Sequence, residues 1–261
     1  MRVQHSAPAL QASQQSDLNY LALNSYFFRI LLGQYDIWLA NSDASEARQI
    51  TRMPAIMTAY GRWSPDGRSL VFHSRLNGYA NLYIVDVETG GYRPLTTGST
   101  NDSAASWSPD NKWIFFESER SGIPQIWKIP AAGGPASQVT RNGAAVALPS
   151  PDGKMLVYSK FNAPGLWMLR LAGGDEVQLA PAISTIDSFA VTKTGVYLAR
   201  PTPNREVSIA FLSFEDRTTQ ELARLKVPAC YGLSVSPDQR SILYAQTDYL
   251  ASDLILGDHF N

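Results

Sequence analysis

One short sequence pattern recurs along the chain. "GRWSPDGRSLVF" begins at Gly61, and "ASWSPDNKWIFF" begins at Ala105. The serine of its Ser-Pro-Asp motif is found at Ser64, Ser108, Ser150 and Ser236, and Thr192 takes the same position in the degenerate copy "VTKTGVYL", giving intervals of 44, 42, 42 and 44 residues. A period of this length is typical of stacked or radial repeat folds, because each repeat is one unit that buries its apolar faces against its neighbours.

A second motif follows the first in each repeat. It reads "NLYIVDVETGGYRPLT" from Asn81 and "QIWKIPAAGGPASQVT" from Gln125, and six copies are recognisable, the earliest from Asp36. Five copies of the first motif are recognisable, since the segment before Asp36 lacks the turn residues. The two counts together predict six repeats.

Each repeat has a simple physical interpretation. Pro65 presets φ for a turn, Asp66 can bond to the local backbone and Gly67 accepts positive φ, so "SPDG" predicts a hairpin. The strand segments that follow, such as "SLVFHS", are apolar at consecutive positions, which is typical of sheets covered on both faces. We therefore predict an all-β fold, a six-bladed β-propeller of four-stranded antiparallel blades with the first and fifth blades degenerate. The absence of a 3.6-residue apolar period excludes a helical solenoid.

The domain organisation follows from the repeats. We expect a single propeller domain over residues 19–261, preceded by residues 1–18 as an N-terminal tail or a closing strand. The final repeat lacks a fourth strand, and an open apolar sheet edge would invite aggregation. Part of "RVQHSAPALQ" is therefore expected to pair with the strand around Leu254 to Leu256; alternatively, the tail is disordered and the ring closes by packing alone.

Tryptophans recur at fixed places in the repeats. Trp63 and Trp107 precede the turn, and Trp38, Trp127 and Trp167 share one position in the second motif. A large flat ring repeated in each unit fits wedge-shaped packing between adjacent sheets, so we interpret these residues as core. An exposed aromatic cage for a ligand is the alternative.

Composition excludes several classes of function. The chain has 261 residues and a net charge of -1, with no run of Lys and Arg, which argues against direct nucleic-acid binding by this chain. The polar N-terminus lacks the apolar core of a signal peptide, which favours the cytoplasm and leaves the periplasm open. "YLALNSYFFRILLG" is too short to span a bilayer and contains Arg29, so no membrane span is expected. The one cysteine, Cys230, cannot form an internal disulfide.

The repeats resemble a known family. "WSPDGRSLVFHSRLNGYANLYIVDVETG" and "WSPDNKWIFFESERSGIPQIWKIPAAGG" are similar to the WD-repeat-like, PD40-type β-propeller repeats of TolB-like proteins, from about Gln34 to Asn261. The ending "LSVSPDQRSILYAQTDYLASDLILGDHF" resembles the C-terminal propeller domains of bacterial winged-helix transcription regulators and of some serine/threonine kinases. In those proteins the propeller is the sensory or interaction part, which the resemblance implies for this chain.

The sequence contains no complete catalytic motif. "YGLSVSPD" places Gly232 and Ser234 as in a nucleophile elbow, but Ser236 stands where the second glycine belongs. The three histidines are scattered without ligand spacing, and the Ser-Pro-Asp aspartates are explained by their turns. We expect no catalytic residue, no metal ligand and no cofactor.

The loops that enter the innermost strands are the best candidates for binding. "RMPAIMTAYGRW", "TGSTNDSAASW" and "RNGAAVALPS" are predicted to converge at one mouth of the central channel, and loops on a rigid scaffold commonly carry binding residues. Tyr60, Arg62, Asp102 and Ser106 are the candidate ligand- or partner-binding residues. Arg75 and Arg120 are interpreted as structural arginines that bond carbonyl groups of a neighbouring loop.

These observations favour a non-catalytic propeller that binds or senses a protein, a peptide or a small ligand, as part of or partner to a bacterial signalling or transcription-regulatory protein. The alternative is a propeller-type enzyme, either a lyase or the accessory propeller of a serine peptidase. A third hypothesis is a mainly structural assembly module.

Overall fold

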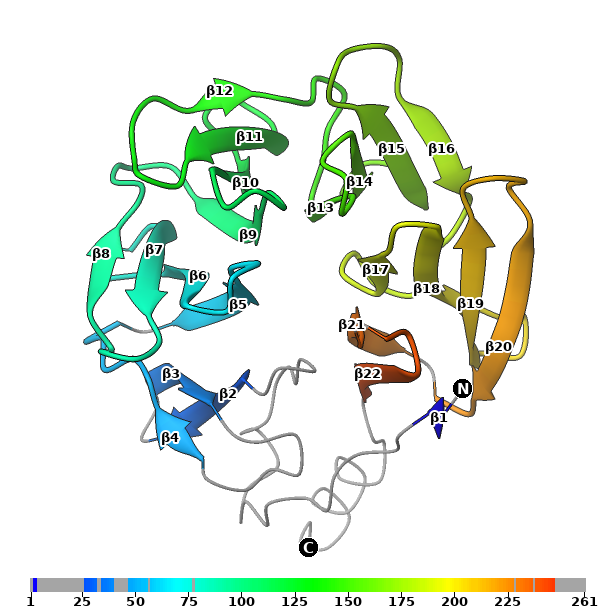
Figure 1. The fold of residues 1–261 in the computed structure, drawn as a ribbon, viewed down its shortest axis with the longest axis horizontal. Helices are drawn as coiled ribbons and strands as arrows, with labels where there is room; N and C mark the ends of the chain where they lie inside the picture. The colour runs from blue at the N-terminus through cyan, green and yellow to red at the C-terminus, as the bar shows by residue number, and fades with distance from the viewer. Residues whose placement is uncertain are drawn as a thin grey trace, which may run out of the picture.

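The fold is a ring of β-sheets around a common centre (Figure 1). The computed structural model describes residues 2–3, 26–31, 34–39, 47–55, 57–76, 78–227, 229–236 and 238–246. Within these ranges every regular element is a strand, and none is a helix that could span a membrane. Four of the sheets have four strands and two have three.

The four-stranded sheets are complete propeller blades. In each sheet the strands follow chain order and neighbouring strands are antiparallel, which confirms an all-β propeller of four-stranded antiparallel blades. The innermost strands are β5 (Thr58–Trp63), β9 (Asp102–Trp107), β13 (Ala147–Pro149) and β17 (Phe189–Val191) (Figure 1). The second strands are β6 (Ser69–Ser74), β10 (Trp113–Ser118), β14 (Met155–Ser159) and β18 (Gly195–Pro201). The third strands are β7 (Asn81–Asp86), β11 (Gln125–Pro130), β15 (Leu166–Arg170) and β19 (Val207–Ser213). The outer strands are β8 (Tyr92–Pro94), β12 (Ser137–Gln138), β16 (Val177–Ala180) and β20 (Thr219–Leu225).

Two three-stranded sheets flank the complete blades in the chain. The first contains β2 (Tyr26–Leu31), β3 (Gln34–Leu39) and β4 (Arg48–Gln49). The second contains β21 (Cys230–Val235), β22 (Ser241–Gln246) and β1 (Arg2–Val3). The N-terminal strand β1 lies parallel to β22. The pairing expected at Leu254 to Leu256 lies outside the described residues, so it stays a prediction, as does the division into residues 1–18 and 19–261.

The fifth repeat is degenerate in its turn sequence but not in its sheet. Strands β17 to β20 form a complete four-stranded blade, so the expectation of a degenerate fifth blade holds for its sequence and not for its architecture. The hydroxyl of Thr192 donates to the carbonyl of Gly195 at 2.9 Å, and the Thr192 amide donates to the same carbonyl at 2.8 Å. A tight turn therefore forms here without the Pro-Asp pair, because two bonds from one residue close it.

The Ser-Pro-Asp turns are held by three local hydrogen bonds. The Ser64 hydroxyl donates to the Asp66 carboxylate at 2.6 Å, which also accepts the Arg68 amide at 3.1 Å, and Ser64 Oγ accepts the Ser69 amide at 2.9 Å. The same three bonds recur at Ser108, Ser150 and Ser236. The bond from Ser64, more than any other contact, lowers the pKa of Asp66. The turn interpretation of these aspartates is confirmed.

A threonine ties the end of each regular repeat back to its third strand. The Thr140 hydroxyl accepts the Ile126 amide at 2.8 Å and donates to the Gln125 side chain at 2.7 Å. Thr51 makes the equivalent pair of bonds, 15 residues after its acceptor Asp36. In the fourth repeat Ala180 takes the place of the threonine and Gly165 that of its acceptor. The φ of Gly165 is +90°, and a Cβ there would lie 2.1 Å from the Ala180 carbonyl oxygen. Glycine is required there because the chain approaches too closely for a side chain.

The core lies between adjacent sheets. Val71 and Leu82 of one blade and Ile114 and Phe116 of the next form one buried cluster, which confirms that the continuous apolar runs are covered on both faces. Four of the repeated tryptophans pack, partly buried, against such clusters: Trp63, Trp107, Trp127 and Trp167. Their interpretation as packing residues is confirmed.

Candidate binding site

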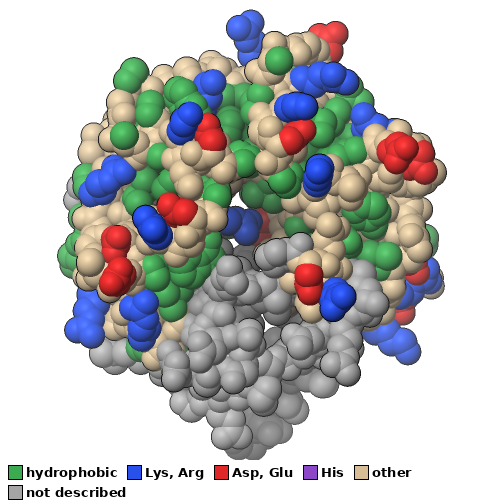
Figure 2. All heavy atoms as spheres, in the orientation of Figure 1, with side chains coloured by type: hydrophobic (Ala, Val, Ile, Leu, Met, Phe, Trp, Pro, Cys, Tyr) green, Lys and Arg blue, Asp and Glu red, His purple; other side chains and the backbone are tan. Residues whose placement is uncertain are grey.

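The four predicted site residues lie on two neighbouring innermost strands. Tyr60 and Arg62 belong to β5, and Asp102 and Ser106 belong to β9. The indole nitrogen of Trp107 donates to the Arg62 carbonyl at 3.0 Å and links the two strands. The space-filling view has a narrow opening at the centre of the ring, with basic and acidic side chains at its floor (Figure 2).

Two of the four residues are committed to internal contacts. Asp102 is 2% exposed, and Arg120 Nη2 donates to both of its carboxylate oxygens at 2.7 Å. The Ser106 hydroxyl donates to the carbonyl of Ala147 on β13 at 2.7 Å and fastens one blade to the next. Tyr60 and Arg62 are the predicted residues that remain partly exposed. The binding role of all four stays a prediction.

Arg120 is structural, but its partner differs from the one expected. It holds a carboxylate rather than a loop carbonyl, and its Nε donates to Ser118 Oγ at 2.9 Å. Its guanidinium also lies over the rings of Phe116 and Trp127, 5.1 Å from each centroid. This charged group therefore packs over two aromatic rings while it neutralises Asp102. Arg75 donates to the carbonyl of Gly78 in its own loop at 3.4 Å, and not to a neighbouring loop as expected.

Tyr60 lies at an irregularity of the inner strand. Its φ is +56°, and the pairing of β5 with β6 shifts between Ala59 and Arg62. The ring stacks on His73 with 5.4 Å between centroids. Burial, aided by the charge of Arg75, lowers the pKa of His73 to about 4, so this imidazole is neutral at physiological pH. Its Nδ1 is buried and has no hydrogen-bond partner among the described residues, so packing holds the ring.

A buried carboxyl group lies beside the predicted site. Glu117 of β10 is 5% exposed and accepts a 2.7 Å hydrogen bond from Ser103 of β9. Burial raises its pKa to about 7, and the nearby charges of Glu119 and Asp102 add to the shift. The sequence analysis missed Glu117; the available signal was one acidic residue inside the apolar strand "WIFFES".

A second polar network fastens one blade internally. Lys160 Nζ donates to Glu176 at 2.6 Å, and the hydroxyl of Tyr158 donates to the other oxygen of the same carboxylate. The ammonium group also lies 3.9 Å from the centroid of the Trp167 ring. Burial acts to raise the pKa of Glu176, but the hydrogen bonds from Lys160 and Tyr158 outweigh it and lower the value overall. Since its charges are paired internally, we assign the network to stability.

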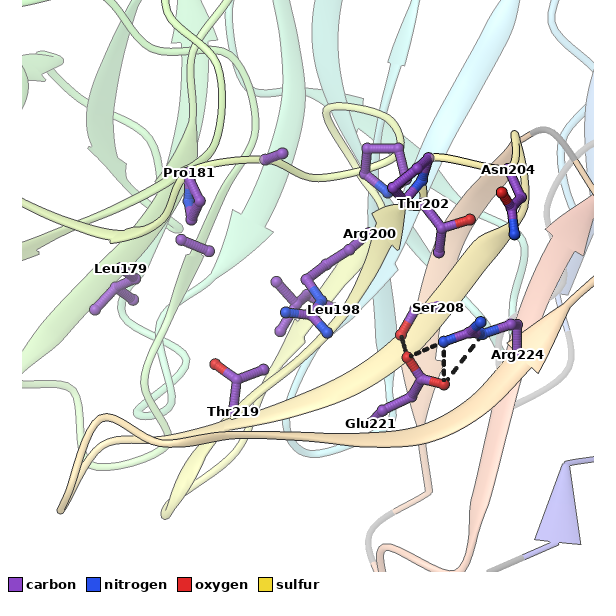
Figure 3. A pocket seen from close by; sticks show the side chains of 14 residues that line it. Leu179, Pro181, Leu198, Arg200, Thr202, Asn204, Ser208, Thr219, Glu221 and Arg224 are labelled. Atoms are coloured by element: carbon purple, nitrogen blue, oxygen red, sulfur yellow. Dashed lines mark hydrogen bonds and ion pairs between the residues drawn. The ribbon is translucent and has the colours of Figure 1, made fainter.

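A cavity of about 590 Å³ lies apart from β5 and β9. It lies where the end of β16 meets strands β18 to β20, and its polar lining includes Arg200, Glu221 and Arg224 (Figure 3). This volume is within the range of about 300–1,000 Å³ that is typical of small-molecule sites. The sequence analysis did not predict it.

Comparison with known proteins identifies the family. A sequence profile described as TolB beta propeller domain matches residues 13–229. The chain belongs to the TolB β-propeller family. The crystal structure of TolB from Acinetobacter baumannii superposes with a TM-score of 0.69 at 19% identity, over 83% of this chain and 55% of that one. An uncharacterized protein of Agrobacterium fabrum is 28% identical over 144 residues, 54% of this chain and 48% of its own length. This TolB-family chain thus matches about half the length of these two relatives.

Enzymes share the same fold. An oligogalacturonate lyase in complex with manganese has a TM-score of 0.65 at 15% identity, over 85% of this chain and 67% of the lyase. A puromycin-hydrolyzing peptidase of Mycobacterium tuberculosis has a TM-score of 0.61 at 17% identity, over 79% of this chain and 37% of the peptidase. These likenesses describe the propeller and leave its chemistry open.

Ser234 lies inside β21, paired with Leu243, and not on a turn that leaves a strand. In the ranges given above, no three His, Cys, Asp or Glu side chains gather as a metal site would need.

Proposed function

We propose that this TolB-family propeller is a non-catalytic binding module that recognises a protein or peptide partner, or senses a small ligand, at the channel-facing surface of β5 and β9. The observation that carries the proposal is the partial exposure of Tyr60 and Arg62 on a rigid inner strand. An aromatic ring and a guanidinium group are the side chains most enriched where protein interfaces gain their affinity. Propellers of the TolB type also commonly mediate protein interactions.

The experiment is a binding measurement with a partner identified by cross-linking and then purified. Arg62→Ala and Tyr60→Ala are expected to weaken binding by about tenfold or more each, as residues at the centre of an interface do. Arg68→Ala, on the exposed turn of the same blade, is the control. Asp102 is left intact, because its loss would free the buried end of Arg120 and disturb the fold. Equal affinities for the wild type and the Arg62 variant would place the interface elsewhere.

We also propose six blades and a role within bacterial signalling or transcription regulation. The six copies of the second motif support the blade number, together with the four complete blades and two three-stranded sheets among the described residues. The resemblance of the C-terminal sequence to propellers of winged-helix regulators and kinases supports the role. A crystal structure of the whole chain would give the number of blades. Sequencing of the full reading frame would show whether an effector domain is fused to the propeller.

The alternative function is a propeller-type enzyme, and Glu117 is the feature among the described residues that favours it. A carboxyl group with a pKa near 7 suits general acid-base catalysis. However, Glu117 is almost fully buried and its carboxylate bonds to Ser103, so it does not meet substrate in this arrangement. Glu117→Gln would abolish activity of such an enzyme and leave partner binding unchanged in the proposed module.

A further inference from the structure

The cavity beside the blade formed by β17 to β20 has two walls from different sheets. One face of this blade supplies Leu198 and Arg200 of β18, which are two residues apart and so project to the same side. The end of β16 supplies Leu179 and Pro181 as the opposite wall (Figure 3). The cavity therefore combines an apolar wall with a charged one.

Arg200 supplies a hydrogen-bond donor with no acceptor. Its Nε is buried and has no hydrogen-bond partner among the described residues. A buried hydrogen-bond donor of a charged group costs free energy when it has no acceptor, so such donors are normally paired. The Glu221 carboxylate of the same lining already accepts bonds from Ser208 at 2.8 Å and from Arg224 at 3.0 Å (Figure 3).

The strand register places these groups in one row. Arg200 pairs with Ser208 across β18 and β19, and Ser208 pairs with Arg224 across β19 and β20. Two guanidinium groups therefore flank one hydroxyl. Glu221 bonds Arg224, and the nearby charge of Glu206 also acts on Arg224. The lining carries one excess positive charge, which suits a monoanion better than a dianion.

We propose that this cavity binds a carboxylate that bears a short apolar substituent. The guanidinium of Arg200 donates to the carboxylate, whose planar oxygens match its planar donors. The apolar substituent packs against Leu179 and Pro181 and leaves water. This site is separate from the surface of β5 and β9, so it does not rest on the function proposed there.

The carboxylate can come from a free organic acid or from the C-terminus of a peptide, and the test has an arm for each. The free-acid probe is 4-phenylbutyrate, with the neutral 4-phenylbutyramide as its matched control. The peptide probe is Ala-Ala-Ala-Phe with a free C-terminus, with the C-terminally amidated form as its control. Binding to the whole chain is measured by calorimetry and by ligand-observed NMR.

The expected result is that at least one acid binds and that its amide binds about tenfold or more weakly, since a hydrogen bond between charged groups is lost. Arg200→Leu is expected to weaken binding of the acid by the same factor. Arg170→Leu, at an exposed arginine of the neighbouring blade, should leave binding unchanged. Binding by the peptide acid alone assigns the carboxylate to a peptide terminus.

Three results would overturn the proposal: no binding of either acid, equal binding of acid and amide, or wild-type affinity in Arg200→Leu. If Arg200→Leu fails to fold, Thr219→Trp replaces it, because Thr219 is an exposed lining residue and the larger ring fills the cavity without touching the inner strands. Wild-type affinity for the acid in Thr219→Trp would equally overturn the proposal.

Discussion

Replacing Glu117 by glutamine should make the protein more stable at neutral pH and leave it unchanged in acid. Glu117 is 5% exposed, and burial raises the pKa of its carboxyl group from 4.5 to about 7. The folded state thus keeps the proton up to about pH 7, whereas the unfolded chain loses it near pH 4.5. Glutamine keeps the shape and can still accept the hydrogen bond from Ser103, but it carries no charge to bury.

The sign and size of the effect follow from proton linkage. Since the folded state binds more protons than the unfolded state between pH 4.5 and 7, the free energy of unfolding of the wild type falls as pH rises through this window. The slope is about 1.4 kcal/mol per pH unit, which amounts to about 3 kcal/mol over the window. At pH 7.5 the Glu117→Gln variant should be more stable by that amount, equivalent to a rise in Tm of about 5–10 °C.

The assay is urea unfolding of both proteins at half-unit steps from pH 4.5 to 8. The difference between the two curves is the quantity to follow, because His73, whose pKa burial lowers to about 4, contributes a slope of the opposite sign to both proteins. Glu88→Gln, which removes a carboxyl group at an exposed position on another blade, is the control. A constant difference between wild type and Glu117→Gln at every pH would refute the buried, protonated carboxyl group.

Three further predictions test the scaffold and the absence of hydrolase chemistry. Arg120→Met leaves a buried carboxylate without its ion partner and should lower the free energy of unfolding by about 3–5 kcal/mol in urea titrations; a loss under about 1 kcal/mol would contradict that pairing. Gly165→Ala drives a Cβ into the Ala180 carbonyl and should destabilise by about 1–3 kcal/mol more than Gly153→Ala, which has a similar positive φ and open space around it; equal losses would remove the steric argument. A fluorophosphonate probe should leave Ser234 unlabelled by mass spectrometry, and stoichiometric labelling would establish a serine nucleophile.

The sequence alone determined the blade architecture because the signals that specify it are local. Hydrogen bonds of the Ser64 hydroxyl close the Ser-Pro-Asp turn, and their partners lie no more than five residues away. The sequence of a single repeat is therefore enough to predict the turn. Continuous apolar strands then predict cover on both faces, and the buried cluster around Phe116 confirms it. The Thr140 bond to Gln125 is equally regular, since the same spacing of 15 residues joins Thr51 to Asp36, but the sequence analysis did not predict it.

The tertiary structure decided which polar residues are free to act, because that depends on partners from other strands and other repeats. Asp102 looks like a binding residue in sequence, yet Arg120, 18 positions later, saturates both of its oxygens. Glu117 becomes a perturbed acid only when neighbouring strands remove its water. Arg200 belongs to a strand with no distinguishing motif. Its buried Nε donor becomes a candidate ligand-binding group only because the end of β16 lines a cavity beside it. Burial and pairing across sheets are properties of the assembled ring, and no single repeat encodes them.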